Sequence, residues 1–271
     1  MSRRPLATTT VREALESAVI ALTAAGCDTP RLDAEVLLAY VLGVDRAALI
    51  VDSRRALTGD EARAFMDFAR RRREREPVAY IVGTRGFRRL ELAVDARVLV
   101  PRPETEHLVE AALDLPRGAR VVDVGTGSGA VALALKDERP DLDVLATDVS
   151  ADALDVARAN ARGLDVTFVL GDLLAGIEDV DAVVSNPPYV EVGARVMREL
   201  AYEPAGALLA GPDGLDVIRR LVALPVRWLA LEHGAGQADA VEALARAAGF
   251  AEVSRVRDLA GIERVAIARR A

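Results

Sequence analysis

From Ala119 onward, short apolar runs with the composition of buried strands alternate with segments of helical periodicity. Strands are expected over 120–124, 143–147, 166–170, 181–185, 228–232, 251–256 and 263–268, the last two as an antiparallel pair. Helices are expected over 130–136 and 151–161. Strands that alternate with helices build mostly parallel sheets that are covered on both faces. The sequence therefore predicts an α/β fold with a doubly wound, mostly parallel sheet and an antiparallel C-terminal strand.

Residues 1–75 have helical periodicity and no strand pattern. Helices are expected after Thr10, which has capping-box spacing, between Pro30 and Gly43, and over 58–75. The second of these helices is expected to direct four side chains to one face: Leu32, Val36, Leu37 and Tyr40. These patterns predict a small helical N-terminal domain.

A linker is expected over 76–103, where the pattern changes. Residues 80–82 and 90–94, together with Phe87, have strand-like composition, and glycines separate them. The linker is therefore expected to contain a β-hairpin. A helix should follow over 104–115 and open the third segment, 104–271.

The composition narrows the class of protein. The formal net charge is −7, whereas proteins that bind nucleic-acid phosphates usually present a basic face. Two histidines and the single Cys27 are too few for a metal cluster. No apolar run approaches the ~20 residues that span a bilayer, and residues 1–10 lack the apolar stretch of a secretory signal. We therefore expect a cytoplasmic protein without a metal, a membrane or an obligatory nucleic-acid partner.

The connection after the first predicted strand is rich in glycine. Residues 123–129 read Asp-Val-Gly-Thr-Gly-Ser-Gly and lead into a helix. Glycines at a helix start let backbone N–H groups approach a ligand closely, although a tight turn would use them too. The G-x-G-x-G spacing resembles the cofactor loop of class I methyltransferases, which implies S-adenosylmethionine as the cofactor. The candidate cofactor-binding residues in this loop are Gly125, Thr126, Gly127, Ser128 and Gly129.

Two acidic residues follow the next two predicted strands. Asp148 is placed to accept hydrogen bonds from both hydroxyls of a ribose; the alternative, a helix cap, suits Ser150 better. Asp172 is expected to accept a hydrogen bond from an adenine amino group, unless it forms only a surface turn. Leu173 beside it is expected to pack on the adenine.

The segment Asn186-Pro187-Pro188-Tyr189, directly after the fourth predicted strand, is the most informative stretch. Pro187 forces Asn186 toward an extended conformation, and neither proline has an N–H group. Ligands of open α/β sheets bind at the carboxyl ends of the strands. A turn without function rarely requires these residues at such a place, so we interpret the segment as catalytic. Asn186 is also a candidate cofactor-binding residue.

These residue types suit methyl transfer to a planar NH2 group. The lone pair of such a nitrogen is delocalised, as the ~18–20 kcal/mol rotation barrier of an amide indicates, so it attacks a sulfonium methyl poorly. The side-chain oxygen of Asn186 and the carbonyl of Pro187 can accept its two N–H groups and direct the lone pair at the methyl. Tyr189 is expected to stack on the planar group, near the sulfonium charge. The motif does not distinguish glutamine from adenine, cytosine or guanine.

At these residues the chain resembles the HemK/PrmC family, the N5-glutamine methyltransferases of release factors. The resemblance runs from about Glu76 onward, and the segment 100–106, Val-Pro-Arg-Pro-Glu-Thr-Glu, is typical of this family. Further matching segments are 76–83, 123–129, Asp148, 186–189, 203–204, 207–208, 214–216, 232–234 and Gln237. The N-terminal domain matches only in size and helicity, and Leu173 stands where some members have an aromatic residue.

The resemblance implies a class I, Rossmann-like methyltransferase domain over 104–271 that uses S-adenosylmethionine. The implied substrate is the glutamine of the Gly-Gly-Gln motif in bacterial class-I release factors 1 and 2. It also implies that the helical domain, 1–75, helps to bind the release factor, and we expect a monomer. Arg102 and Glu104 follow rigid prolines and are candidate substrate-binding residues at the entrance, along with 186–189; the alternative is an ion pair at a helix start.

Two other functions share these features. A DNA or RNA methyltransferase that acts on an exocyclic amino group, N6 of adenine or N2 of guanine, would use the same tetrapeptide and would predict a basic cleft. A non-enzymatic binding module could also use this fold, because fold alone does not determine function. The intact tetrapeptide argues against that third possibility.

Overall fold

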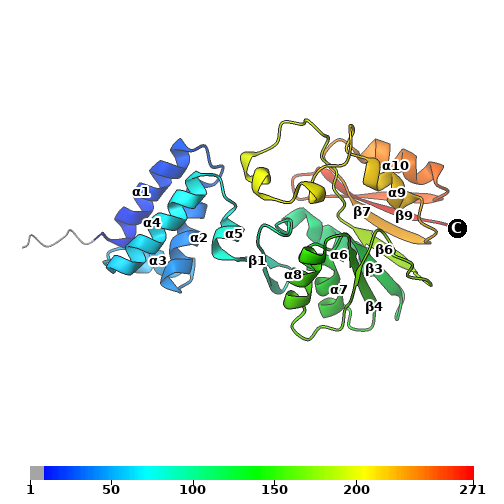
Figure 1. Ribbon diagram of the computed structural model, residues 1–271, viewed down its shortest axis with the longest axis horizontal. Coiled ribbons are helices and arrows are strands. Elements are labelled where there is room, and N and C mark those ends of the chain that lie inside the picture. Colours follow the sequence, from blue (N-terminus) through cyan, green and yellow to red (C-terminus); the bar gives the residue numbers. More distant parts are fainter. Residues whose placement is uncertain (1–8) are drawn as a thin grey trace, which may run out of the picture. The chain divides into compact units, whose positions relative to one another are not determined.

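The computed structural model describes residues 9–271, so the segment before Thr9, where no secretory signal is expected, lies outside the described residues. The chain divides into two compact units after Gly83, inside the segment where a linker was expected. One unit is built from helices and the other contains two sheets (Figure 1). Within residues 9–271, no helix is long and apolar enough to cross a lipid bilayer.

The N-terminal unit is helical, as predicted. Its helices are α1 (Val11–Ala24), α2 (Pro30–Leu42), α3 (Arg46–Val51), α4 (Gly59–Arg73) and α5 (Val78–Val82). Capping boxes begin α1 at Thr10 and α4 at Thr58, because each threonine accepts from the N–H three residues later while that residue's glutamate accepts in return. Gly43 ends α2 in the left-handed conformation.

The buried face of α2 differs from the prediction. Leu32 and Tyr40 are exposed, whereas Leu37 and Leu38 are fully buried. Asp33 is buried too, and Arg72 Nε donates to its Oδ2 at 2.7 Å. Because α1, α3, α4 and α5 all contact α2, several sides of this helix are covered. Hydrophobic periodicity alone could not show that an ion pair lies on the inner side.

The strand predicted over 80–82 was wrong, because Val78–Val82 forms the helix α5. Gly83 ends that helix with φ +79°, and Ile81 and Val82 pack into the core of the N-terminal unit. A short apolar run has no period that separates a strand from one turn of helix. The predicted hairpin follows as β1 (Thr84–Phe87) and β2 (Leu90–Ala93), which pair antiparallel.

The described part of the second unit is built on a seven-stranded sheet in the order β5-β4-β3-β6-β7-β9-β8. The strands are β3 (Arg120–Val124), β4 (Asp143–Asp148), β5 (Thr167–Leu170), β6 (Ala182–Ser185), β7 (Trp228–Glu232), β8 (Glu252–Arg257) and β9 (Glu263–Arg269). β5, β4, β3, β6 and β7 are parallel, and β9 pairs antiparallel with both β7 and β8. This confirms the predicted mostly parallel sheet with an antiparallel C-terminal strand.

Helices cover both faces of this sheet (Figure 1). They are α6 (Glu106–Ala112), α7 (Ala130–Glu138), α8 (Ala151–Ala161), α9 (Asp216–Val222) and α10 (Ala238–Ala247). α6 and α7 pack into one apolar core, and α9 and α10 pack into the other. The helix expected over 104–115 is shorter, since a 3-10 turn, Pro103–Thr105, precedes α6. Two further 3-10 turns, Arg198–Tyr202 and Ala205–Ala207, lie between β6 and α9.

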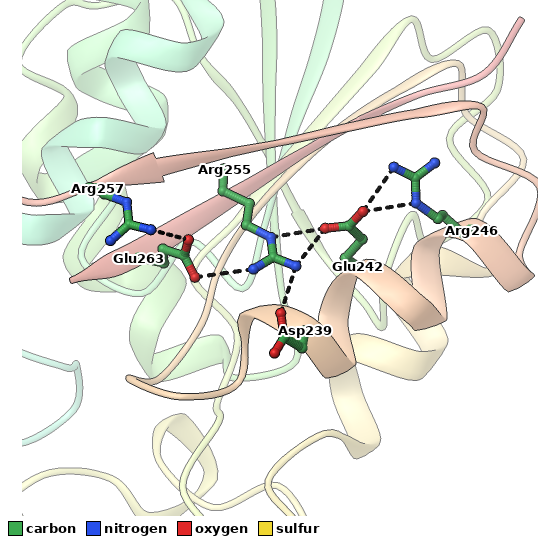
Figure 2. A network of polar contacts seen from close by, with 6 residues as sticks. All are labelled: Asp239, Glu242, Arg246, Arg255, Arg257 and Glu263. Carbon is green, nitrogen blue, oxygen red and sulfur yellow. Dashed lines mark hydrogen bonds and ion pairs between the residues drawn. The ribbon is translucent and has the colours of Figure 1, made fainter. Parts of the chain in front are cut away.

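An ionic network joins α10 to the β8–β9 edge of the sheet (Figure 2). Arg255 on β8 lies at its centre and contacts Asp239 and Glu242 on α10 as well as Glu263 on β9. These side chains are exposed to solvent, which screens their charges, so the pairs contribute little to stability. The network links α10 to β8 and β9 beside the carboxyl end of β7, since Glu232 pairs with Val265 near the start of β9.

Candidate functional site

The glycine-rich turn connects β3 to α7 at the carboxyl edge of the sheet. The N–H groups of Gly125 and Thr126 both donate to the carbonyl of Thr147 on β4, at 2.9 and 3.0 Å. Gly129 has φ +83°, and a Cβ atom there would lie 2.9 Å from Cδ1 of Leu133. Only glycine suits this position, because the turn passes directly over the first residues of α7.

Thr126, Ser128 and Gly129 hold the turn together and do not line the cavity described below. Thr126 is buried, and its hydroxyl donates to Asp123 Oδ2 at 2.6 Å. Ser128 is also buried, and its carbonyl accepts from Asn160 Nδ2 at 2.9 Å. In the structure these residues make contacts that hold the loop, and their role in cofactor binding stays a prediction.

Asp148 ends β4 beside this turn. Its Oδ2 accepts from the N–H of Gly127 at 2.9 Å, and its Oδ1 accepts from the N–H of Ser150 at 2.9 Å. Ser150 caps α8, as expected, by accepting from Ala153 N. A carboxylate has about four acceptor positions, so two remain on Asp148 for a ligand.

A cavity of 280 Å³ opens at the carboxyl ends of β3, β4 and β6. The predicted cofactor-binding residues that line it are Gly125, Gly127, Asp148, Asp172 and Leu173. Three residues of the predicted catalytic segment line it as well: Asn186, Pro187 and Pro188. The structure thus brings together residues that are more than sixty positions apart in the chain, from Gly125 to Asn186.

Asp172 and Leu173 lie at the edge of this cavity, in the turn after β5. Asp172 forms an exposed ion pair with Arg220 on α9, which also lines the cavity. Leu173 has φ +51°, and its carbonyl accepts from the Thr147 hydroxyl at 2.7 Å. The turn that we considered for Asp172 is therefore present, and it lies on the cavity wall.

Asn186 follows β6 and directs its two amide ends differently. Nδ2 donates to Oγ1 of Thr105 at 3.0 Å. Oδ1 is buried and has no hydrogen-bond partner within the described residues. A buried acceptor without a partner costs about 1–3 kcal/mol, and native proteins seldom leave one without a reason. At the wall of a cavity, such an atom is available to a ligand that carries an N–H group.

Tyr189 does not line this cavity. Its ring packs against the apolar core that contains α9 and α10, and its hydroxyl donates to Glu232 Oε1 at 3.2 Å. Burial raises the pKa of the Tyr189 hydroxyl, and the neighbouring Glu232 carboxylate raises it further. The side chain is therefore a neutral donor that ties the predicted catalytic segment to the end of β7.

Arg102 and Glu104 also stay outside the lining of this cavity. Arg102 Nη2 lies 2.6 Å from Oε1 of Glu203, a carboxylate that is almost completely buried. Burial raises the pKa of Glu203, and Arg102 opposes that shift. The charge of Glu104 raises the pKa of Glu232. Arg102 thus forms an ion pair with a distant segment, which differs from the ion pair at a helix start that we considered as the alternative.

Sequence reasoning assigned no role to Thr105, Glu232 or Gln237. Gln237 accepts from Gly234 N at 2.8 Å and donates to the Tyr189 carbonyl at 3.1 Å. Glu232 is 1% exposed, and burial raises its pKa to about 7. One signal was available for Glu232, because a glutamate that ends an otherwise apolar strand must lie at the carboxyl edge with the other site residues.

We predict that the free energy of unfolding depends on pH because of Asp123, a buried carboxyl group on β3 that bonds to Thr126 of the glycine-rich turn. Burial raises its pKa to about 7, although Thr126 and the N–H of Ala132 oppose the shift. An unfolded chain releases this proton near pH ~4, so stability falls as the pH rises from about 4 to about 7. Asp123→Asn should therefore flatten the dependence of unfolding free energy on pH in this window.

Urea unfolding at a series of pH values measures this effect. Asp155→Asn, on the exposed side of α8, is the matched control and should keep the wild-type slope. Parallel curves for the wild type and the Asp123 variant would contradict the assignment.

Comparisons with known proteins agree along nearly the whole chain. Residues 13–83 match the family described as PrmC N-terminal domain, and residues 103–221 match the methyltransferase small domain. A release factor glutamine methyltransferase from Mycolicibacterium smegmatis is 44% identical, over 97% of this chain and 98% of its own length. A relative of the same name from Deinococcus radiodurans is 44% identical, over 96% of this chain and 99% of its own.

One solved structure supports the fold. The hMettl16 catalytic domain, in complex with MAT2A 3'UTR hairpin 1, aligns with a TM-score of 0.54 over 86% of this chain and 91% of its own. Its sequence identity is 18%, so this likeness concerns the fold alone. The family follows from the sequence relatives, whose alignments cover both the N-terminal and the methyltransferase segments of the chain. The chain therefore belongs to the release factor glutamine methyltransferase family and is a methyltransferase.

Proposed function

We propose that this enzyme transfers a methyl group from S-adenosylmethionine to the side-chain nitrogen N5 of the glutamine in the Gly-Gly-Gln motif of bacterial release factors. The observation that carries the proposal is Asn186 Oδ1, a buried acceptor without a partner in residues 9–271 at the wall of the cavity. An amide NH2 group supplies the donor that this atom lacks. The names of the sequence relatives support release factors as the substrate class.

The cavity has the groups that an adenosyl sulfonium compound requires. Asp148 keeps acceptor positions for two ribose hydroxyls, since backbone N–H groups occupy only two of its four. Leu173, Val149 and Val217 add apolar surface for a purine ring, and Asp172 is an acceptor at its edge. Bound there, the cofactor supplies an electrophilic methyl group. We infer that Gly125 and Gly127 let the backbone approach it closely.

The catalytic segment acts on the nitrogen that receives the methyl group. Asn186 Oδ1 and the Pro187 carbonyl accept its two N–H groups, so its lone pair points along the line of transfer. No hydrogen bond within the described chain reaches the Pro187 carbonyl, which leaves it available. Positive charge develops on this nitrogen, and by analogy with an oxyanion hole of reversed sign each acceptor contributes about 3–4 kcal/mol. Alignment of the reacting atoms adds up to about 7–11 kcal/mol.

The remaining features of the proposal concern the partner. We infer that the helical N-terminal unit helps to bind release factors 1 and 2, and that the enzyme acts as a cytoplasmic monomer. Arg102 and Glu104 are proposed to act at the substrate entrance, Arg102 through its contact with Glu203. Tyr189 supports the segment from behind through Glu232.

Incubation with a purified release factor and isotopically labelled S-adenosylmethionine tests the proposal. We expect one methyl group per factor, located by mass spectrometry of the Gly-Gly-Gln peptide. A factor whose motif glutamine is replaced by glutamate is the matched control and should gain none. Labelling of DNA or RNA without labelling of the factor would contradict the proposal and support the nucleic-acid alternative.

A further inference from the structure

The Asn186 side chain is held from behind by a residue of another segment. Nδ2 donates to Oγ1 of Thr105, which is 4% exposed and directly precedes α6. The two ends of a side-chain amide have nearly the same shape, so packing alone does not select which end faces the cavity. If the amide were reversed, its NH2 group would face the substrate nitrogen, and two donors would meet. The bond to Thr105 is thus what keeps the oxygen toward the cavity.

Thr105 by itself cannot make this selection. A hydroxyl group both donates and accepts, so it could pair with either end of the amide. Glu232 removes the ambiguity in its ionised form, which predominates above its pKa of about 7 and only accepts. The Thr105 side chain lowers the pKa of Glu232, against the larger effect of burial. Glu232 Oε2 is buried and has no partner of normal hydrogen-bond geometry in the described chain, so it is the acceptor open to the Thr105 proton.

The sheet brings these groups together. β6 and β7 are parallel neighbours with Ser185 beside Leu231, so Asn186 and Glu232 follow at the same carboxyl edge. The other oxygen of Glu232 accepts from the Tyr189 hydroxyl at 3.2 Å. Asn186 and Tyr189 are the two ends of the catalytic segment. The Glu232 carboxylate bonds directly to Tyr189, and it is linked to Asn186 through Thr105.

We propose that Thr105 and Glu232 are positioning residues, which orient the Asn186 amide with its oxygen toward the substrate nitrogen. Glu232 accepts a hydrogen bond from the Thr105 hydroxyl, and the Thr105 oxygen in turn accepts from Asn186 Nδ2. Neither residue lines the cavity, so both act through Asn186. The inference rests on the proposed function, since it is Asn186 Oδ1 that receives the substrate N–H group.

Replacement of Thr105 by valine tests this assignment. Valine has the same shape and no hydroxyl, so the amide of Asn186 loses its selecting partner. We expect kcat to fall by about 10- to 100-fold, as expected for misplacement of a reacting group, while the Kd of the cofactor stays unchanged. Thr105→Ser restores the hydroxyl and should recover most of kcat. Thr167→Val, on the exposed edge strand β5, is the matched control and should keep the wild-type kcat.

A double-mutant cycle separates a positioning role from a merely structural one. If Thr105 acts through Asn186, then Thr105→Val should cause no further loss of kcat in the Asn186→Ala background. Glu232→Gln replaces a carboxylate oxygen by an NH2 donor. It should likewise lower kcat in the wild-type background and cause no further loss of kcat in the Asn186→Ala background. Circular dichroism and cofactor titration of each variant establish that it is folded.

The outcomes distinguish this inference from the proposed function. If Asn186→Ala lowers methylation of the release factor and Thr105→Val does not, the positioning role is wrong and the proposed function stands. Equal losses from Thr105→Val in both backgrounds would also overturn the positioning role, because the residue would then act independently of Asn186. If the wild-type enzyme leaves the release factor unlabelled, the proposed function itself fails.

Discussion

Replacement of Asn186 by alanine is expected to lower kcat for methylation of the release factor by on the order of 10²–10³-fold. The side-chain oxygen is the one acceptor of the catalytic segment that a substitution can delete, because the Pro187 acceptor belongs to the backbone. Its loss leaves one N–H group of the substrate without an acceptor while positive charge develops on the nitrogen. The alanine variant also cannot direct the lone pair of the amide at the methyl group.

Cofactor binding should survive this substitution. Asp148 and the glycine-rich turn belong to β4 and the β3–α7 connection, and neither makes a hydrogen bond to Asn186 in the described chain. Single-turnover methyl transfer gives the rate, and calorimetric titration gives the Kd of S-adenosylmethionine. Glu191→Ala, an exposed position shortly after the segment, is the matched control and should retain the wild-type rate. Unchanged turnover in the Asn186 variant would defeat the mechanism.

Local sequence signals sufficed for most of the fold. Trp228–Glu232 and Ala151–Ala161 begin and end where they were predicted, since an apolar strand and a serine-capped helix are both encoded by adjacent residues. The failures lie where distant contacts decide. Val78–Val82 became a helix although its apolar run also suits a strand, and Asp33 turned inward to meet Arg72 from another helix. No periodicity contains that information.

The site divides along the same line. Residues 123–129 and 186–189 could be identified because each motif is contiguous and its place after a strand has a chemical meaning. The contacts to the motif could not, because Thr105 bonds to Asn186 and Glu232 bonds to Tyr189 from two other segments. Tyr189 illustrates the difference, since its hydrogen bond to Glu232 is visible only once β6 and β7 are paired.

Asp148→Ala is expected to weaken cofactor binding by on the order of 10²–10⁴-fold, because two charge-assisted hydrogen bonds of about 1.5–3 kcal/mol each are lost. The effect should appear in the Kd of S-adenosylmethionine, while kcat at saturating cofactor falls much less. Asp148 makes no contact with the nitrogen that receives the methyl group in the proposed mechanism. The two substitutions, at Asn186 and at Asp148, should therefore separate turnover from binding.

Asp148 also accepts from Gly127 in the glycine-rich turn, so its removal could weaken cofactor binding by disturbing the turn. A second variant separates this effect from the loss of the ribose contacts. Asp148→Asn keeps an oxygen that can accept from one backbone N–H group, and it removes the negative charge. We expect its Kd to lie between those of the wild type and Asp148→Ala. Asp143→Asn, at the opposite end of β4 and paired with Arg120, is the matched control and should bind normally. If both Asp148 variants bind S-adenosylmethionine as the wild type does, the ribose is held elsewhere, and the cavity at the carboxyl ends of β3 and β4 is not the cofactor site.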